Sequence, residues 1–252
     1  MIIEDIHYRV RLKFNKINTN TKKTFNDLEL DMVIQSAIDE YIEIFYSGSN
    51  PKKYKLGFEV TQQRIDMLST LVVSQLEQPM LTPASSNADL GLYEFKLSEL
   101  VHPYRHFLRG NIKVEGCDKL YNLAIEQHDD LNNVLDDHNR IPSTKWLRAI
   151  GVMKKDSSTI GNSSIYVYTA GEFIPEGLYI EYLKEAAQVS LGTYTEVPTA
   201  ENTNPPLKPK VECDLPEAYH SLVVDMAVQE LTRILEDTQY PLRQEKIISS
   251  AH

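Results

Sequence analysis

The sequence has few of the residues that build covalent cross-links, metal sites or cofactor-binding loops. Its 252 residues include two cysteines, Cys117 and Cys213, and ten scattered glycines. Two isolated cysteines without a CxxC pair predict reduced thiols rather than a disulfide framework or a metal site. The sequence contains no GxGxxG, GxxxxGK[ST], GxSxG or HExxH pattern. These absences give no support to catalysis, and we expect a protein that is not an enzyme and holds no cofactor.

Long apolar runs and an excess of basic residues are also missing. No stretch of about 18 apolar residues occurs, so the sequence predicts no membrane span, and its first residues lack the apolar core of a signal peptide. The formal net charge is −10. Proteins that coat nucleic acid are usually basic, so this charge disfavours general DNA wrapping but suits a surface along which DNA slides.

What is present is helical periodicity at both ends of the chain. Residues 214–237 carry a continuous apolar stripe at three- and four-residue steps, which predicts a long C-terminal helix that organises the fold. Asp214 and Glu217 have the spacing of an N-terminal capping box. Residues 1–17 fit a strand and a helix equally well by period, and we prefer the helix.

Two further helices are expected before residue 80. Asn26, with Glu29 three residues later, predicts the start of a helix that closes at Gly48. Apolar residues at helical spacing in 57–76 predict another helix, which Pro79 ends.

Between these regions the pattern changes to short alternating segments separated by turn residues. Strands are predicted at 93–97, 107–115, 120–127, 145–153, 164–169 and 178–183, with a short helix at 129–137. Strands at this spacing without long intervening helices predict an antiparallel sheet or small barrel.

The expected fold class is therefore α+β: a helical bundle with a long C-terminal helix and an inserted antiparallel β domain. The predicted organisation is an N-terminal helical part (1–91), the inserted β domain (92–190), and a proline-rich connection with the C-terminal helix and tail (191–252).

Three groups of residues are candidate sites, each with a simpler structural explanation. His102 and His106 are four apart, but Pro103 and the neighbouring strands argue against a shared helix face, so metal ligation is disfavoured. The acidic stretch 126–138 lacks the alternating oxygen ligands and glycine of a calcium loop, and a solvated helix capped by Asp129 explains it better. The lysines at 22–23 and 52–55 are interpreted as solvated helix ends rather than DNA contacts.

Taken in order along the chain, several segments resemble the virion ring proteins of crAss-like tailed bacteriophages, a group of head-to-tail connector (adaptor) proteins. The most specific are FEVTQQRID (58–66), the acidic helix followed by a PS turn (129–143), and LPEAYHSLVVDMAV (215–228). The similarity extends over nearly all of the chain, although these are packing patterns rather than chemical signatures. Members of this group often carry Asp-Pro after the acidic helix, where this chain has Asp137 and His138, so the local turn stays open.

The resemblance implies a structural virion protein that forms a ring, dodecameric in this group, below the portal, assembled in the host bacterial cytoplasm. Its partners would be further copies of itself, the portal, neighbouring tail proteins, and double-stranded DNA that passes through the lumen without sequence-specific binding; no membrane is implied. Two alternatives remain at this point. One is a monomeric α+β interaction adaptor outside a virion, and the other is a metal-dependent hydrolase that uses the 129–138 cluster.

A ring requires contacts between subunits, and six residues are predicted to lie in them. Ala227 is a small residue in the middle of the C-terminal stripe, where another helix can approach closely. After Pro241 the tail carries apolar residues but is too short for a core of its own, so we expect it to dock on a neighbouring subunit. The predicted interface residues are Ala227, Arg233, Tyr240, Leu242, Ile247 and Ile248.

Overall fold

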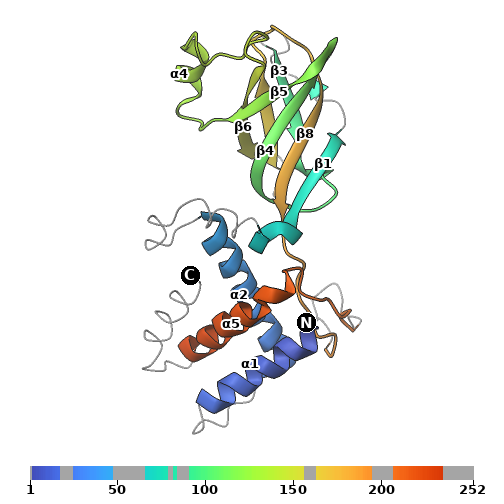
Figure 1. Cartoon of the computed structure of the whole chain (residues 1–252), viewed down its shortest axis with the longest axis vertical. Helices are drawn as coiled ribbons and strands as arrows, with labels where there is room; N and C mark the ends of the chain where they lie inside the picture. The colour runs from blue at the N-terminus through green and yellow to red at the C-terminus, as the bar shows by residue number, and fades with distance from the viewer. Residues whose placement is uncertain are drawn as a thin grey trace, which may run out of the picture. The chain divides into compact units, whose positions relative to one another are not determined.

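A computed structural model describes residues 2–17, 25–47, 66–78, 82–83, 91–155, 163–194 and 207–234. The chain divides into two compact units (Figure 1). The helical unit combines Met1–Leu71 with Ala186–His252, and the sheet unit is the continuous segment Val72–Glu185 between them. Both ends of the chain therefore contribute to the same unit.

The helical unit contains α1 (Ile3–Ile17), α2 (Asp27–Ser47) and α5 (His220–Ile234), and α5 packs against the other two. The helix expected at residues 1–17 is confirmed. Its apolar residues Ile3, Ile6, Val10 and Phe14 are all buried, because three- and four-residue steps place them on one face. None of the helices in the described ranges is long and apolar enough to cross a membrane.

The capping signal of α2 is also confirmed. The backbone N–H of Asn26 donates to Glu29 Oε2 at 2.8 Å, which is one half of a capping box. Most of the stripe predicted for this helix is buried, including Leu30, Ile34 and Tyr41.

The C-terminal helix begins later than the sequence suggested. A 3-10 turn, η5 (Glu217–Tyr219), precedes α5, and Asp214 accepts a hydrogen bond from the Ala187 N–H at 3.3 Å instead of capping the first turn. The expected stripe is buried at Val223, Ala227 and Leu231. The buried face is broader than the stripe, because it includes Val224 and Val228, and also Thr232, which was expected on the polar side. The stretch 235–237 lies outside the described residues.

The sheet unit is built on one eight-stranded sheet within the described residues, in the order β1-β8-β4-β5-β6-β7-β3-β2. The strands are β1 (Val72–Gln78), β2 (Thr82–Pro83), β3 (Leu92–Lys96), β4 (Tyr104–Val114), β5 (Cys117–Ile125), β6 (Arg148–Lys155), β7 (Ser163–Tyr168) and β8 (Pro175–Lys184). The short elements are η2 (Ser69–Leu71), η4 (Leu97–Glu99) and α4 (Leu131–Asp136). All six strands predicted between residues 93 and 183 are present.

The sheet curls around its own core (Figure 1). Side chains from β3 to β8 meet in a single apolar cluster that includes Phe95, Ile112, Leu123, Val167 and Tyr182. Strand β6 is buried on both faces. Its Ala149 points into this cluster, whereas Ile150 and Val152 pack under Leu131 and Val134 of α4 on the other face.

The expectation of a helical bundle with an inserted antiparallel β domain is wrong. The largest element is the curled sheet, which is mixed rather than antiparallel, because β5 and β6 pair in parallel. The 22-residue connection through α4 makes this possible, since parallel neighbours need a crossover longer than a hairpin turn. The long C-terminal helix that was to organise a bundle has 15 residues in α5.

The helix expected at 57–76 is confirmed for residues 66–71, which are helical, and is wrong from Val72 onward. Val72–Gln78 forms β1, an antiparallel partner of β8, and the part before residue 66 lies outside the described residues. A short apolar run fits either period, and pairing with β8 decides in favour of the strand.

Candidate functional site

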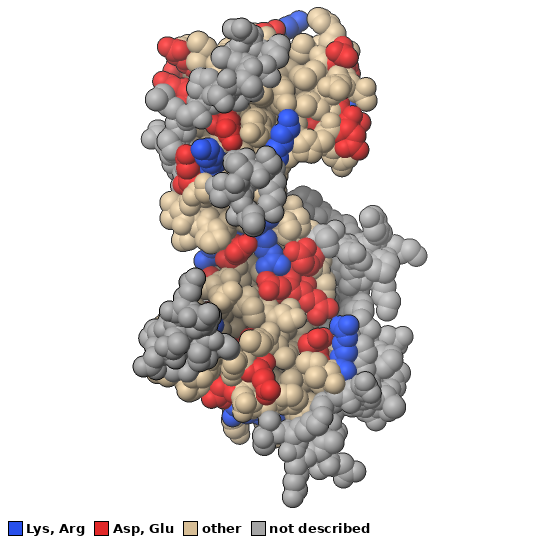
Figure 2. Space-filling view, turned by 180° about the vertical axis from the view of Figure 1, so that it is seen from behind, with Lys and Arg blue, Asp and Glu red and all other residues tan. Residues whose placement is uncertain are grey.

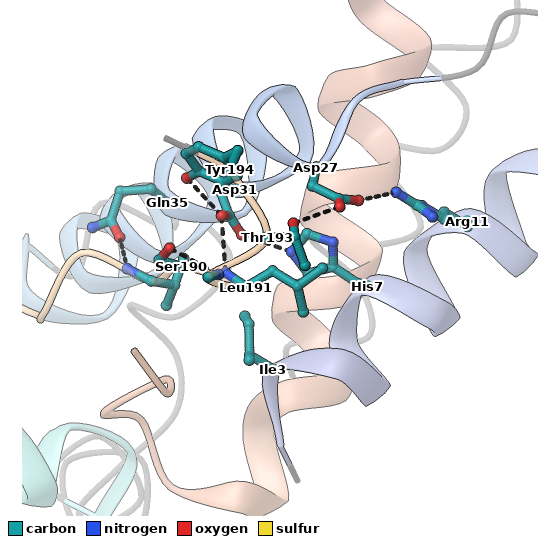
Figure 3. Close-up of polar contacts among 12 residues, drawn as sticks. Ile3, His7, Arg11, Asp27, Asp31, Gln35, Ser190, Leu191, Thr193 and Tyr194 are labelled. Atoms are coloured by element: carbon teal, nitrogen blue, oxygen red, sulfur yellow. Dashed lines mark hydrogen bonds and ion pairs between the residues drawn. The ribbon is translucent and has the colours of Figure 1, made fainter. Parts of the chain in front are cut away.

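The most elaborate polar arrangement in the described part of the chain lies in the helical unit, on one face of α2 (Figure 3). Three residues of α2 stand one turn apart on this face: Asp27, Asp31 and Gln35. They hold residues 189–193, which run beside the helix and bend at Gly192, where φ is 76°. Gln35 Oε1 accepts the Val189 N–H at 3.1 Å, and Asp31 Oδ2 accepts the Leu191 N–H at 3.0 Å.

The spacing of the two elements explains why this arrangement fits. Four residues of helix rise about 6 Å, and two residues of extended chain rise about 6.6 Å. Polar residues at every fourth helix position can therefore meet every second residue of the segment. Thr193 continues the series, because its hydroxyl donates to Asp27 Oδ2 at 2.6 Å. We call residues 27, 31, 35, 189, 191 and 193, together with His7, Arg11 and Tyr194, the clasp.

Helix α1 completes the clasp from the other side. His7 Nε2 lies 2.7 Å from Asp31 Oδ1, and Arg11 forms an ion pair with Asp27. His7 and Arg11 are one turn apart and meet α2 residues one turn apart in the reverse order, so the two helices run antiparallel here. Asp31 is thus shared between α1 and residues 189–193.

Residues 210–212 connect residues 189–193 to the start of α1. Ser190 and Val211 exchange backbone hydrogen bonds of 3.1 and 2.9 Å. The side chain of the neighbouring Glu212 accepts the Ile3 N–H at 2.6 Å. This N–H lies in the first turn of α1, where backbone donors have no partner within the helix and the helix dipole is positive. Lys210 lies between Glu4 and Glu212, at 2.6 and 2.9 Å. The clasp and this second segment therefore join residues 3–11 and 27–35 to residues 189–194 and 210–212.

The carboxylate of Asp31 stays charged although it is buried. Both Asp31 and His7 are 3% exposed. Burial raises the pKa of Asp31, but the hydrogen bonds from His7, Tyr194 and the Leu191 N–H outweigh it and lower the pKa below its ordinary value of 3.8. The Thr193 hydroxyl and, after the opposing effect of burial, the nearby Arg11 lower the pKa of Asp27 as well.

The arrangement is suited to holding elements together rather than to chemistry. An imidazole beside a buried carboxylate is also found in catalytic sites, where the second ring nitrogen faces a nucleophile or substrate. Here the second nitrogen, His7 Nδ1, is buried and has no hydrogen-bond partner in the described part of the chain. The Tyr194 hydroxyl is already engaged, 2.7 Å from Asp31 Oδ2. We therefore interpret the clasp as a structural site.

The lowered pKa values predict that acid destabilises the helical unit. A carboxyl whose folded pKa is depressed adds stability that is complete above its unfolded pKa and is lost as the pH falls through the folded pKa. For Asp27 and Asp31 the loss begins below about pH 4. Urea unfolding followed by circular dichroism from pH 6 to pH 2 measures it.

Glu40 has the opposite effect, because burial and the nearby Glu230 raise its pKa, so its protonation stabilises the folded state. The test therefore compares how the free energy of unfolding changes with pH in the wild type and in Asp27→Asn. Both proteins contain Glu40, so its contribution cancels. The loss of stability below pH 4 should be smaller in the variant. Equal pH dependence in the two proteins would contradict the role given to Asp27.

The signal for the clasp was visible in the sequence but was not used. Asp31 follows Leu30 and precedes Val33 and Ile34, so a charged residue interrupts an apolar stripe. A carboxylate in such a position needs buried partners. The pattern alone does not say that these partners are His7 and Leu191, which are 24 and 160 residues away.

Two of the six predicted interface residues lie in the described part of the chain. Ala227 is completely buried inside the helical unit, and Arg233 is exposed in the last turn of α5, 3.5 Å from Glu230. Tyr240, Leu242, Ile247 and Ile248 lie outside the described residues, as do the lysines at 22–23 and 52–55. The interface assignment stays a prediction.

The acidic stretch forms a helix, but not with the cap that the sequence suggested. Asp130, not Asp129, is the N-cap of α4, and it makes no side-chain capping bond. Glu126 instead pairs with Arg140 at 3.1 Å and Arg148 at 3.2 Å. Within the described ranges no group of three His, Cys, Asp or Glu side chains is placed to hold a metal ion.

The predicted strand context of the histidine pair is partly confirmed. His106 lies on β4, whereas His102 precedes that strand. The backbone of His102 contacts Tyr182, whose hydroxyl donates to the His102 carbonyl oxygen at 3.2 Å. The two cysteines are free and half-buried.

Comparison of the chain with models of known protein families gives no match, and a search of curated proteins gives none either. The resemblance to phage ring proteins rests on the segments quoted above. Of these, 129–143 and 215–228 are within the described residues, on α4 with its following turn and on η5 with the first part of α5.

Proposed function

We propose that this chain is a structural, non-catalytic virion protein that forms a ring below the portal in the head-to-tail connector of a crAss-like phage. The observation that carries the proposal is the resemblance of three separated segments in the same order along the chain. The helical-bundle wall that the resemblance implied is not part of the proposal, because the fold is built on a mixed sheet.

The physical properties of the chain are compatible with this role. A net charge of −10 keeps the protein from adhering to DNA, as a channel component requires. The clasp is a structural site with buried Asp31 and His7 at its centre, and function would come from surfaces. A heterologous contact repeated around a closed axis then makes the ring.

The proposal predicts that many copies join one portal. The purified chain, mixed with the portal protein of the same phage, is expected to add a ring of subunits to each portal assembly, which mass photometry measures as one large, discrete increase in mass. A cryo-EM map of the particle would then contain the chain in the neck. Binding as single copies, or no binding, would instead support the monomeric interaction adaptor.

A further inference from the structure

Two turns at one end of the sheet unit each contain a residue in the left-handed backbone region, which residues other than glycine rarely adopt. Leu147 has φ of 49° and Ala170 has φ of 52°, and they are the two non-glycine residues with positive φ in the described ranges. Left-handed backbone costs an L-residue about 1–2 kcal/mol. Such strain persists only where the surrounding structure holds it, and it is concentrated at functional sites.

Hydrogen bonds fix both turns. Ser143 and Arg148 exchange backbone bonds of 3.0 and 3.1 Å across the first turn, and the Leu147 carbonyl accepts the Asn122 N–H of β5 at 2.8 Å. Glu172, in the second turn, accepts the Thr144 N–H at 2.8 Å. One carboxylate therefore ties the two strained turns together.

Each turn directs one apolar side chain into the core of the sheet and a neighbouring one into solvent. Leu147 and Phe173 pack against the core of the sheet, whereas their neighbours Trp146 and Ile174 are 65% and 58% exposed. Trp146 is the single tryptophan of the chain. Leu120, two residues before Asn122 on β5, is also exposed. We call Trp146, Ile174 and Leu120 the turn patch.

An exposed indole on a turn with a fixed backbone, at the same end of the sheet as two exposed aliphatic side chains, has the properties of an interface anchor. Tryptophan is among the residues most enriched where binding energy concentrates. Because the turns are already fixed, docking would not have to order them, which lowers the entropic cost of association. Lys145 stands 5.1 Å from the centre of the Trp146 ring and gives the patch a charged edge.

The charges around the patch indicate what docks there. This end of the sheet carries exposed groups of both signs: Lys119, Lys145, Glu115, Asp118 and Glu172, beside the ion pair of Lys113 with Glu176 at 3.1 Å. They nearly balance, in a chain of net charge −10. Figure 2 shows that acidic and basic groups are interspersed on the visible face of the described chain.

Copies of an acidic protein repel each other except where a surface is close to neutral. DNA or an anionic membrane would need a basic surface, and a basic partner would need an acidic one. An apolar centre with a rim of both signs fits another near-neutral surface of the same chain, which in a ring is a different surface from the patch itself. We propose that the turn patch docks on a second copy of this chain. This rests on the proposed function, for which it names one contact surface.

The single tryptophan makes the contact directly observable. The full-length protein is examined over a range of concentrations, alone and mixed with portal protein, by mass photometry and tryptophan emission. The emission should shift to shorter wavelength as copies associate, because Trp146 leaves water. Trp146→Ala should weaken copy-to-copy association at least tenfold, the effect of losing an interface anchor.

Two further variants keep the test independent of folding. Ile174→Glu retains the fluorescent reporter and, at an exposed position, leaves the fold intact; it should abolish the emission shift. Val101→Ala is the matched control, since Val101 is 73% exposed and precedes the start of β4, at the opposite end of this strand from the patch. It should associate like the wild type.

Three results would overturn the proposal. The tryptophan emission could stay unchanged while copies associate, or Ile174→Glu could associate as strongly as the wild type. Copies could also fail to associate both alone and in the presence of portal protein. An emission shift that requires portal protein but no second copy would assign the patch to a different partner. If Trp146→Ala still forms complete rings on the portal, the inference fails and the proposed function stands. If copies associate through Trp146 without joining the portal, the proposed function fails instead.

Discussion

Replacing Ala227 with arginine is expected to unfold the helical unit. Ala227 is completely buried on α5, between Val223 and Leu231, which are also buried. Arginine would bring a charge and a long side chain into a close-packed contact with no partner prepared for it. A buried charge without a partner costs several kcal/mol, and a whole domain is stable by only about 5–15 kcal/mol.

The measurement is thermal unfolding of the purified variant followed by circular dichroism at a helix wavelength. Ser221→Arg, an exposed position on the same helix, is the matched control and should melt like the wild type. A soluble Ala227→Arg protein with a native-like melting curve would show that α5 is not packed as described.

Removing the carboxylate of Asp31 is expected to cause the second large loss of stability. Asp31→Ala should destabilise the helical unit by about 3–5 kcal/mol, because three donors lose their acceptor and each buried donor left without one costs about 1–3 kcal/mol. These donors are His7, which is buried, and the partly buried Leu191 N–H and Tyr194 hydroxyl. Urea unfolding at pH 7 measures the loss.

Two variants calibrate this result. Met32→Ala changes the adjacent residue, which is 60% exposed, and should cost less than about 0.5 kcal/mol. Tyr194→Phe removes one of the donors to Asp31 and should cost about 1 kcal/mol. If Asp31→Ala unfolds at the same urea concentration as Met32→Ala, the clasp does not stabilise the unit.

Local signals in the sequence were sufficient for most of the individual elements. The Asn26–Glu29 box placed the start of α2 because both partners are within one turn. Short, turn-bounded apolar segments predicted six of the strands of the sheet unit, β3 to β8, since each strand needs a face in the core. Such signals depend on neighbours close in sequence, so they carry over directly to the structure.

The arrangement of these elements depended on contacts that no local pattern encodes. The parallel pairing of β5 with β6 follows from the path of the chain through α4, and β1 is a strand because β8 is there to receive it. The clasp has the same origin: donors and acceptors on α1 and α2 meet residues 189–194, about 160 residues further along the chain. An odd charge in an apolar stripe marks one participant, Asp31, without naming the others.

The assembly of the helical unit from the two ends of the chain also has a consequence for synthesis on the ribosome. The sheet unit, Val72–Glu185, is continuous and can fold as soon as it emerges, whereas α1 and α2 wait for α5. The interval between Ser47 and Ile234 corresponds to roughly 10–40 s at about 5–20 residues per second. During that time the apolar faces of α1 and α2 are without α5, so the nascent chain offers a binding site for chaperones that the finished protein conceals.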